Sequence, residues 1–167
     1  MRFPISGFRF HCLLFAVYCS LFIAACGSSS GDEPPEIVYG QDVCDQCGMI
    51  ISESRFAASY VTTTGDVRRF ESIEDMLMYH LEHQEEVHIF WVHDYYTEKW
   101  ARGDEAVFVL SETIVTPMDG GVVAVADKAG ADELIAERGG TAVSFDQLLS
   151  LARAGVLEGH DHDMSHD

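Results

Sequence analysis

The stretch Arg69-Phe70-Glu71-Ser72-Ile73-Glu74-Asp75-Met76-Leu77 predicts the fold of the chain around it. A short β-rich run ends at Phe70, Ser72 is a good N-cap, and two acidic residues follow in the first turn, as is usual at the start of an α-helix. Apolar residues then recur at helical spacing up to a helix end that we expect near His83; they are Ile73, Met76, Leu77 and Leu81. The stretch therefore predicts a strand followed directly by a helix.

The segments on both sides of this stretch predict further strands. Upstream, Arg55–Thr62 is rich in β-formers and Thr63–Asp66 is a turn signal, so we expect a β-hairpin there. Downstream, Val87–Val92 is dense in β-branched and aromatic residues and predicts a buried strand. An aromatic connection, Asp94–Trp100, then leads to another predicted strand at Ala106–Leu110.

The second half of the chain echoes the first. Thr141–Leu149 again combines a short strand with a serine cap, Ser144, and an apolar residue followed by an acid. Two segments lead into it: a strand at Val122–Ala126 and a loop or short helix at Ala129–Arg138. We therefore predict an α+β fold of two ββα-type repeats, with Met49 at the entry of one and Met118 at the entry of the other. A chance similarity of two capped helices is the alternative.

The N-terminus has the features of an export signal. Two arginines precede an apolar run, Cys12–Ala25, and Ile23-Ala24-Ala25-Cys26 resembles the bacterial lipobox. We expect a lipoprotein signal peptide over 1–25, lipidation of Cys26, and a tether and linker over 26–40. A transmembrane anchor is the alternative, although the run is shorter than the roughly 20 residues that a span needs. The glycine after Cys26 favours attachment to the outer membrane, facing the periplasm; attachment to the outer face of the cell membrane is the alternative.

The composition limits the partners and the domain count. The chain of 167 residues has a net charge of −18, which becomes −20 once the signal and its two arginines are removed. Such an acidic protein will not bind nucleic acid through a basic face. We expect one domain over 41–158, with approximate halves 41–100 and 101–158, and a disordered His/Asp-rich tail over 159–167. The histidines and the methionine of this tail could capture metal ions loosely, or the tail could be an acidic end without function.

The motif Cys44-Asp45-Gln46-Cys47-Gly48-Met49 carries the chemistry. Thiolate and thioether are soft donors that together select Cu(I), whereas zinc sites rarely use methionine. A zinc half-site and a redox-active CxxC pair remain alternatives. A structural disulfide would close a very short loop and stabilise little. If the two halves pack around a pseudo-two-fold axis, Cys47, Met49 and Met118 could form one site between them, with His93 as a weaker candidate ligand.

With the lipobox, this motif, the Asp94–Trp100 segment and Thr116-Pro117-Met118 before two glycines, the chain resembles the NosL family, the lipoprotein accessory factors of nitrous oxide reductase. The resemblance implies two ββαβ-like half-domains with small antiparallel or mixed sheets and packed helices. It also implies that Cu(I) is bound and passed to nitrous oxide reductase together with an ABC-type membrane complex. Cys47 and Met49 match the family's Cys-x-Met element and Met118 its second methionine, while many relatives lack Cys44.

We therefore expect a membrane-anchored Cu(I)-binding chaperone rather than an enzyme, with Cys47, Met49, Met118 and Cys44 as the ligand candidates. It would serve nitrous oxide reductase, in denitrification, or another exported copper enzyme. A CxxC thiol-disulfide oxidoreductase, a general copper-scavenging lipoprotein and a purely structural lipoprotein are the other hypotheses.

Overall fold

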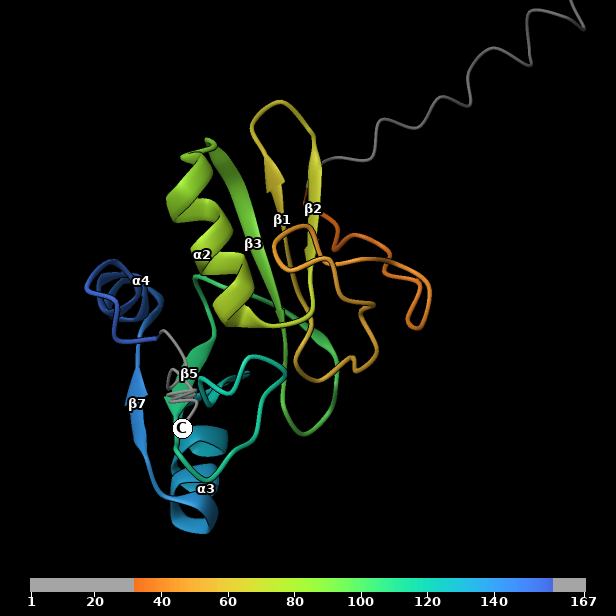
Figure 1. The fold of residues 1–167 in the computed structure, drawn as a ribbon. Coiled ribbons are helices and arrows are strands. Elements are labelled where there is room, and N and C mark those ends of the chain that lie inside the picture. The colour runs from red at the N-terminus through yellow and green to blue at the C-terminus, as the bar shows by residue number, and fades with distance from the viewer. Residues whose placement is uncertain (1–31, 158–167) are drawn as a thin grey trace, which may run out of the picture. The chain divides into compact units, whose positions relative to one another are not determined.

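The computed structural model describes residues 32–157. The predicted signal peptide, the lipidated Cys26 and the His/Asp-rich tail lie outside the described residues. The described part contains seven strands and three helices in two sheets (Figure 1): β1 (Ala58–Thr62), β2 (Val67–Phe70), α2 (Ile73–His83), β3 (Val87–His93), β4 (Trp100–Arg102), β5 (Val107–Leu110), β6 (Val122–Val125), α3 (Lys128–Arg138), β7 (Thr141–Val143) and α4 (Phe145–Arg153). The predicted α+β class is confirmed.

The first sheet has the antiparallel strand order β2-β1-β3-β4. The predicted hairpin is confirmed, with Ala58 opposite Phe70 and Val61 opposite Val67. However, β1 begins later than expected, because the backbone N–H of Ala57 donates to the carbonyl of Glu53 in a turn before the strand. β4 was not predicted from the sequence; its three residues pair with the end of β3 after the aromatic connection.

The second sheet has the antiparallel order β6-β5-β7, which matches β2-β1-β3 in the first. In both units the first strand lies at the centre, its hairpin partner lies on one side, and the strand after the helix lies on the other. The chain therefore contains two ββαβ units, β1-β2-α2-β3 and β5-β6-α3-β7, as the resemblance implied.

The helix pairing on which the repeat was predicted is wrong. By topology α2 corresponds to α3, whereas the helix begun by Ser144 is α4, which follows the second unit. The two serines look alike because each caps a helix: Ser72 accepts from the N–H of Asp75, and Ser144 from that of Gln147. An N-cap is a local signal that unrelated helices share, so it could not identify equivalent elements.

The methionines also differ in position from the prediction. Met49 precedes β1, at the entry of the first unit, but Met118 lies in the connection between β5 and β6. The two residues are therefore not related by the repeat. Any site that contains both must depend on how this connection packs, which is described below.

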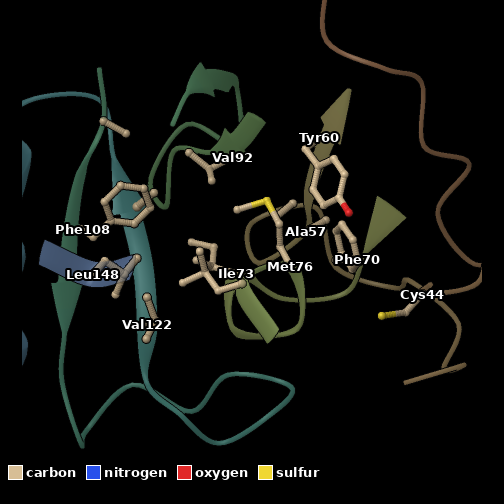
Figure 2. Close-up of a cluster of buried hydrophobic side chains, with 14 of the residues drawn as sticks. Cys44, Ala57, Tyr60, Phe70, Ile73, Met76, Val92, Phe108, Val122 and Leu148 are labelled. Atoms are coloured by element: carbon tan, nitrogen blue, oxygen red, sulfur yellow. The ribbon is translucent and has the colours of Figure 1, made fainter. Parts of the chain in front are cut away.

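One hydrophobic core links the two sheets through α2. Ile73 and Met76 of this helix pack in the same buried cluster as Tyr60 of the first sheet and Phe108 and Val122 of the second (Figure 2). Burial of such side chains contributes about 1.5–3 kcal/mol each. The first turn of α2 thus lies at the centre of the described domain.

The aromatic connection joins the sheets at a second place. The N–H of Tyr95 donates to the carbonyl of Ala124 (2.8 Å), and the N–H of Ala126 to Oδ2 of Asp94 (2.8 Å). Burial works to raise the pKa of Asp94, but hydrogen bonds from Thr97 and Ala126 outweigh it and hold this pKa below its usual range. The ionised side chain of Asp94 therefore holds the aromatic connection against the second sheet.

The last residues of the linker predicted over 26–40 pack on the domain. Ile37 is 8% exposed and belongs to the core cluster, and the guanidinium of Arg69 donates to the carbonyl of Glu36. The apolar run Ile37-Val38-Tyr39 has enough hydrophobic surface to pack on the domain. Within residues 32–157, no helix has the length and hydrophobicity needed to cross a membrane.

Candidate metal centre

The CxxC motif lies in a small lobe, residues 38–51, which is held together by backbone hydrogen bonds. The chain turns at Val38–Asp42, Val43 and Ile50 form an antiparallel bridge, and the N–H of Cys44 donates to the carbonyl of Met49 (2.8 Å). Gly48 has a φ of +74°, a left-handed conformation that glycine adopts without strain. This turn brings the thiol of Cys47 back beside that of Cys44.

Reciprocal hydrogen bonds fasten this 38–51 lobe to β2. The N–H of Asp45 donates to the carbonyl of Arg69 (2.8 Å), and the N–H of Arg69 donates to Oδ2 of Asp45 (2.7 Å). Since α2 begins shortly after β2, these bonds place the two cysteines at the first turn of that helix.

Asp75, in that first turn, meets both thiols. Its Oδ2 lies 3.1 Å from Sγ of Cys47 and 3.3 Å from Sγ of Cys44, and the ligand atoms of the three residues lie within 4.8 Å of one another. Asp75 is fully buried, and its Oδ1 has no hydrogen-bond partner. A buried carboxylate oxygen without a partner costs free energy. Two thiols and an unsatisfied carboxylate thus converge on one point that can hold a metal ion.

Both thiols are held in the protonated form. Burial, ahead of hydrogen bonding with Cys44 and Asp75, raises the pKa of Cys47 to about 12. Burial and the charge of Asp75 also raise the pKa of Cys44, against the lowering effect of backbone hydrogen bonds from Cys47 and Glu71. Cys44 is buried and Cys47 is partly exposed, so Cys47 is the thiol that an incoming ion can reach. A metal would have to displace these protons on binding.

The connection that carries Met118 is tied to the neighbouring residue of α2. Oε1 of Glu74 accepts from the hydroxyl of Thr116 (2.8 Å) and from the N–H of Val122 (3.2 Å). Glu74 is 1% exposed, and burial raises its pKa despite these hydrogen bonds. These neighbouring residues therefore have different partners: Glu74 fixes the 116–122 connection, and Asp75 faces the thiols.

The predicted ligands fall into three groups. Cys44 and Cys47 are brought together, and Met49 lies in the same lobe with 43% of its surface exposed. Met118 is half-buried in the connection that Glu74 anchors, and its role as a ligand stays a prediction. His93 has both ring nitrogens engaged, by the carbonyl of Ala57 and the hydroxyl of Tyr39, so it is a structural histidine.

Asp75 was not predicted from the sequence as a site residue. Acids in the first helical turn were attributed to capping and the helix dipole. The available signal was that Asp75 lies between apolar residues at 73, 76 and 77 that were expected to face the core. A carboxylate among such positions needs a buried partner.

The NosL family model matches residues 36–151 of this chain. The chain belongs to the NosL family. The resemblance inferred from the sequence is thereby confirmed, and the NosL match includes the 38–51 lobe, α2 and the 116–122 connection. The fold is similar to the crystal structure of the copper chaperone NosL from Shewanella denitrificans, with a TM-score of 0.59 and 22% identity over 68% of this chain and 94% of that one. No curated protein sequence matched the chain.

Asp119 lies next to Met118 in the 116–122 connection. It has a φ of +58°, in the left-handed region that aspartate tolerates better than most residues other than glycine and asparagine.

Proposed function

We propose that this NosL-family protein is a membrane-anchored chaperone that binds Cu(I) and delivers it to an exported copper enzyme, most specifically nitrous oxide reductase. The observation that carries the proposal is that Cys44 and Cys47 of the 38–51 lobe converge on Asp75 of α2, which has one oxygen without a partner, and that the thiol of Cys47 is partly exposed. The copper chaperone of known structure with the same fold supports it. The proposed activity is binding and transfer of an ion, without a catalytic step.

In this proposal Cu(I) binds the thiolate of Cys47 with thioethers from Met49 and Met118, and Cys44 lies within reach. Soft sulfur donors suit Cu(I). The exposure of Met49 favours exchange, because a partner can replace one ligand at a time. The anchoring of the 116–122 connection by Glu74 supports the participation of Met118, since it brings that connection to the residue next to Asp75.

Lipidation of Cys26 would hold the protein at a membrane, on the outer membrane facing the periplasm or on the outer face of the cell membrane. A single acyl chain anchors only marginally, so stable attachment requires the multiple chains typical of bacterial lipoproteins. An ABC-type membrane complex would take part in the transfer, as the family resemblance implies.

The main competing function is thiol–disulfide exchange. Reactive CxxC cysteines have a lowered pKa, produced by positive charge or by a helix N-terminus acting on the sulfur. Here both sulfurs face the carboxylate of Asp75, in the first turn of α2, and the pKa of Cys47 is raised to about 12. The environment of the thiols therefore favours metal binding over redox catalysis.

The first test is an anaerobic Cu(I) titration of the reduced protein, Gly27–Asp167, against a competing chelator, beside a chain that ends at Gly159. We expect one tight equivalent in both. Cys47→Ser should abolish this binding, whereas Ser150→Ala, on the exposed face of α4, should not change it. Loss of tight binding with the tail would move the site to its histidines, and a general scavenger would bind copper but deliver none to an apoenzyme.

A further inference from the structure

The 38–51 lobe has an apolar surface that the binding of copper does not require. Of the eight large hydrophobic side chains exposed within residues 32–157, five belong to this lobe: Val38, Tyr39, Val43, Met49 and Ile50. Val43 and Ile50 are 53% and 54% exposed and lie directly opposite each other in the bridge, so their side chains are neighbours on one face. Apolar side chains gathered in this way mark an interaction surface.

Acidic residues flank this apolar surface in the sequence. Residues 32–54 contain no lysine or arginine and six acids: Asp32, Glu33, Glu36, Asp42, Asp45 and Glu53. Arg69 of β2 reaches the lobe, with its Nε 3.6 Å from Oδ2 of Asp42. Arg68 and Arg102 also interact with Asp45 and Asp32, but these three cations do not balance six acids. The apolar residues of the lobe therefore belong to a strongly negative segment, whose six acids we call the acidic rim.

This charge pattern discriminates between possible occupants. A second copy of the chain would bring two negative rims together, and the net charge of −18 adds to that repulsion. An anionic membrane surface would be repelled for the same reason. A protein with an apolar patch and a basic rim is complementary in both respects.

The position of the copper site supports the same occupant. Met49 belongs to the exposed surface, and Cys47 lies two residues before it in the same turn. A protein that covers Val43 and Ile50 would bring its own ligands next to these sulfurs. Contact at this face would thus allow the ion to pass without entering water.

We propose that the 38–51 lobe is the docking face for the protein that receives the copper, and that this partner carries basic residues around an apolar centre. The proposal rests on the proposed function, because it identifies the surface through which delivery occurs. It predicts that docking and copper affinity can be separated by mutation.

The test compares Cu(I) transfer from the full-length lipidated protein in detergent to two acceptors, apo-nitrous oxide reductase and the small chelator bathocuproine disulfonate. The variant Val43→Ser/Ile50→Ser should transfer Cu(I) to the enzyme at least about tenfold more slowly than wild type. The salt dependence of this transfer should be the same as in wild type, because the acidic rim is intact. Transfer to the chelator should not change. Val156→Ser, at an exposed valine outside the lobe, is the matched control and should behave as wild type.

The outcomes separate the two proposals. If wild type and the Val43→Ser/Ile50→Ser variant transfer Cu(I) to the enzyme at the same rate, the docking face is overturned and the delivery function remains. Copper binding by the wild type without transfer to the enzyme would overturn both delivery to this enzyme and docking through the lobe.

Hydroxyl-radical footprinting of the copper-free protein identifies the occupant directly. In nanodiscs of phosphatidylethanolamine and phosphatidylglycerol, Tyr39, Met49 and Ile50 should stay reactive and become protected when apo-nitrous oxide reductase is added. Protection by the nanodisc alone would assign the face to the membrane. Protection that increases with protein concentration in detergent would assign it to a second copy. Either result would overturn the proposal.

Discussion

The Sγ atom of Cys47 lies 3.1 Å from Oδ2 of Asp75, a fully buried side chain in the first turn of α2. A carboxylate that accepts hydrogen bonds from two thiols stabilises their protonated forms. The metal-free protein therefore keeps a CxxC pair that is poor at attacking electrophiles and available to a thiophilic ion.

We expect Asp75→Asn to make the thiols more reactive. Removing the negative charge lowers the pKa of Cys47, although burial, which is the larger cause, keeps it above its ordinary value. A lower pKa gives more thiolate at a given pH, about tenfold for each unit. The rate of alkylation by iodoacetamide at pH 8, followed by mass spectrometry, should rise several-fold.

The matched control for that experiment is Glu82→Gln. Glu82 is an exposed acid of α2 that accepts from the side chain of Gln46, so this variant removes a charge near the lobe without touching the thiols. It should alkylate as wild type. Identical rates for Asp75→Asn and wild type would show that Asp75 does not control the thiols.

Met118→Leu should weaken Cu(I) binding by at least about tenfold, which corresponds to about 1.4 kcal/mol. Leucine keeps the size and hydrophobicity but has no sulfur. Met78→Leu, at a half-buried methionine of α2, should leave the affinity unchanged. Competition titrations with a chelator measure both, and equal affinities for the Met118 and Met78 variants would remove Met118 from the ligand set.

Thr116→Val should affect both stability and copper affinity. The hydroxyl of Thr116 donates to Glu74 and accepts from the N–H of Gly121. Valine therefore leaves the N–H of Gly121 without this acceptor and removes one of the two donors to Oε1 of Glu74. We expect a loss of about 1–3 kcal/mol in the free energy of unfolding by urea, together with weaker Cu(I) binding because the Met118 connection loosens.

Thr113→Val is the control for this effect. Its hydroxyl donates to the carbonyl of Arg138, so the variant also loses a hydrogen bond, but away from Glu74. Copper affinity should then match that of wild type. An unchanged affinity in Thr116→Val would mean that this hydrogen bond does not position Met118.

Acid should weaken the fold partly through Glu85. Hydrogen bonds from Arg68 and then Tyr60 lower the pKa of Glu85. A carboxyl whose pKa is lower in the folded than in the unfolded state stabilises the protein above its unfolded pKa, and this contribution is lost as the pH falls through the folded value. Glu85→Gln should therefore cost about 1 kcal/mol at pH 7 and progressively less below pH 4.

Urea denaturation at pH 7, 5 and 3.5 measures this dependence. Glu105→Gln is the control, because Glu105 is highly exposed and only 3.5 Å from Arg102 in a surface ion pair. It should change stability little at any pH. A difference between wild type and Glu85→Gln that stays constant with pH would show that the carboxylate charge is not the cause.

The elements that sequence could predict are those with local signals. The β-forming residues and the turn signal Thr63–Asp66 indicated the β1–β2 hairpin, and the cap at Ser72 with helical spacing indicated α2. The pairing of α2 with α3 is not local, because it depends on which strand each helix precedes in the sheet. β4 was missed because three residues carry too little pattern, and its pairing with β3 defines it.

The same distinction applies to the site. The CxxC-x-Met spacing marked Cys44, Cys47 and Met49 because all lie in one turn. Asp75 joins them only because the bonds between Asp45 and Arg69 place the lobe against α2. That long-range register has no signature in the sequence of either segment.

The adjacency of Glu74 and Asp75 limits how the chain can vary in length. Each residue turns an α-helix by about 100°. One residue inserted or deleted between the Ser72 cap and Glu74 would therefore rotate both carboxylates away from their partners together. The contacts of Asp75 with the thiols and those of Glu74 with the 116–122 connection would then be broken together. The hairpin turn at residues 63–66 faces no such constraint, so length changes should be tolerated there but not in the first turn of α2.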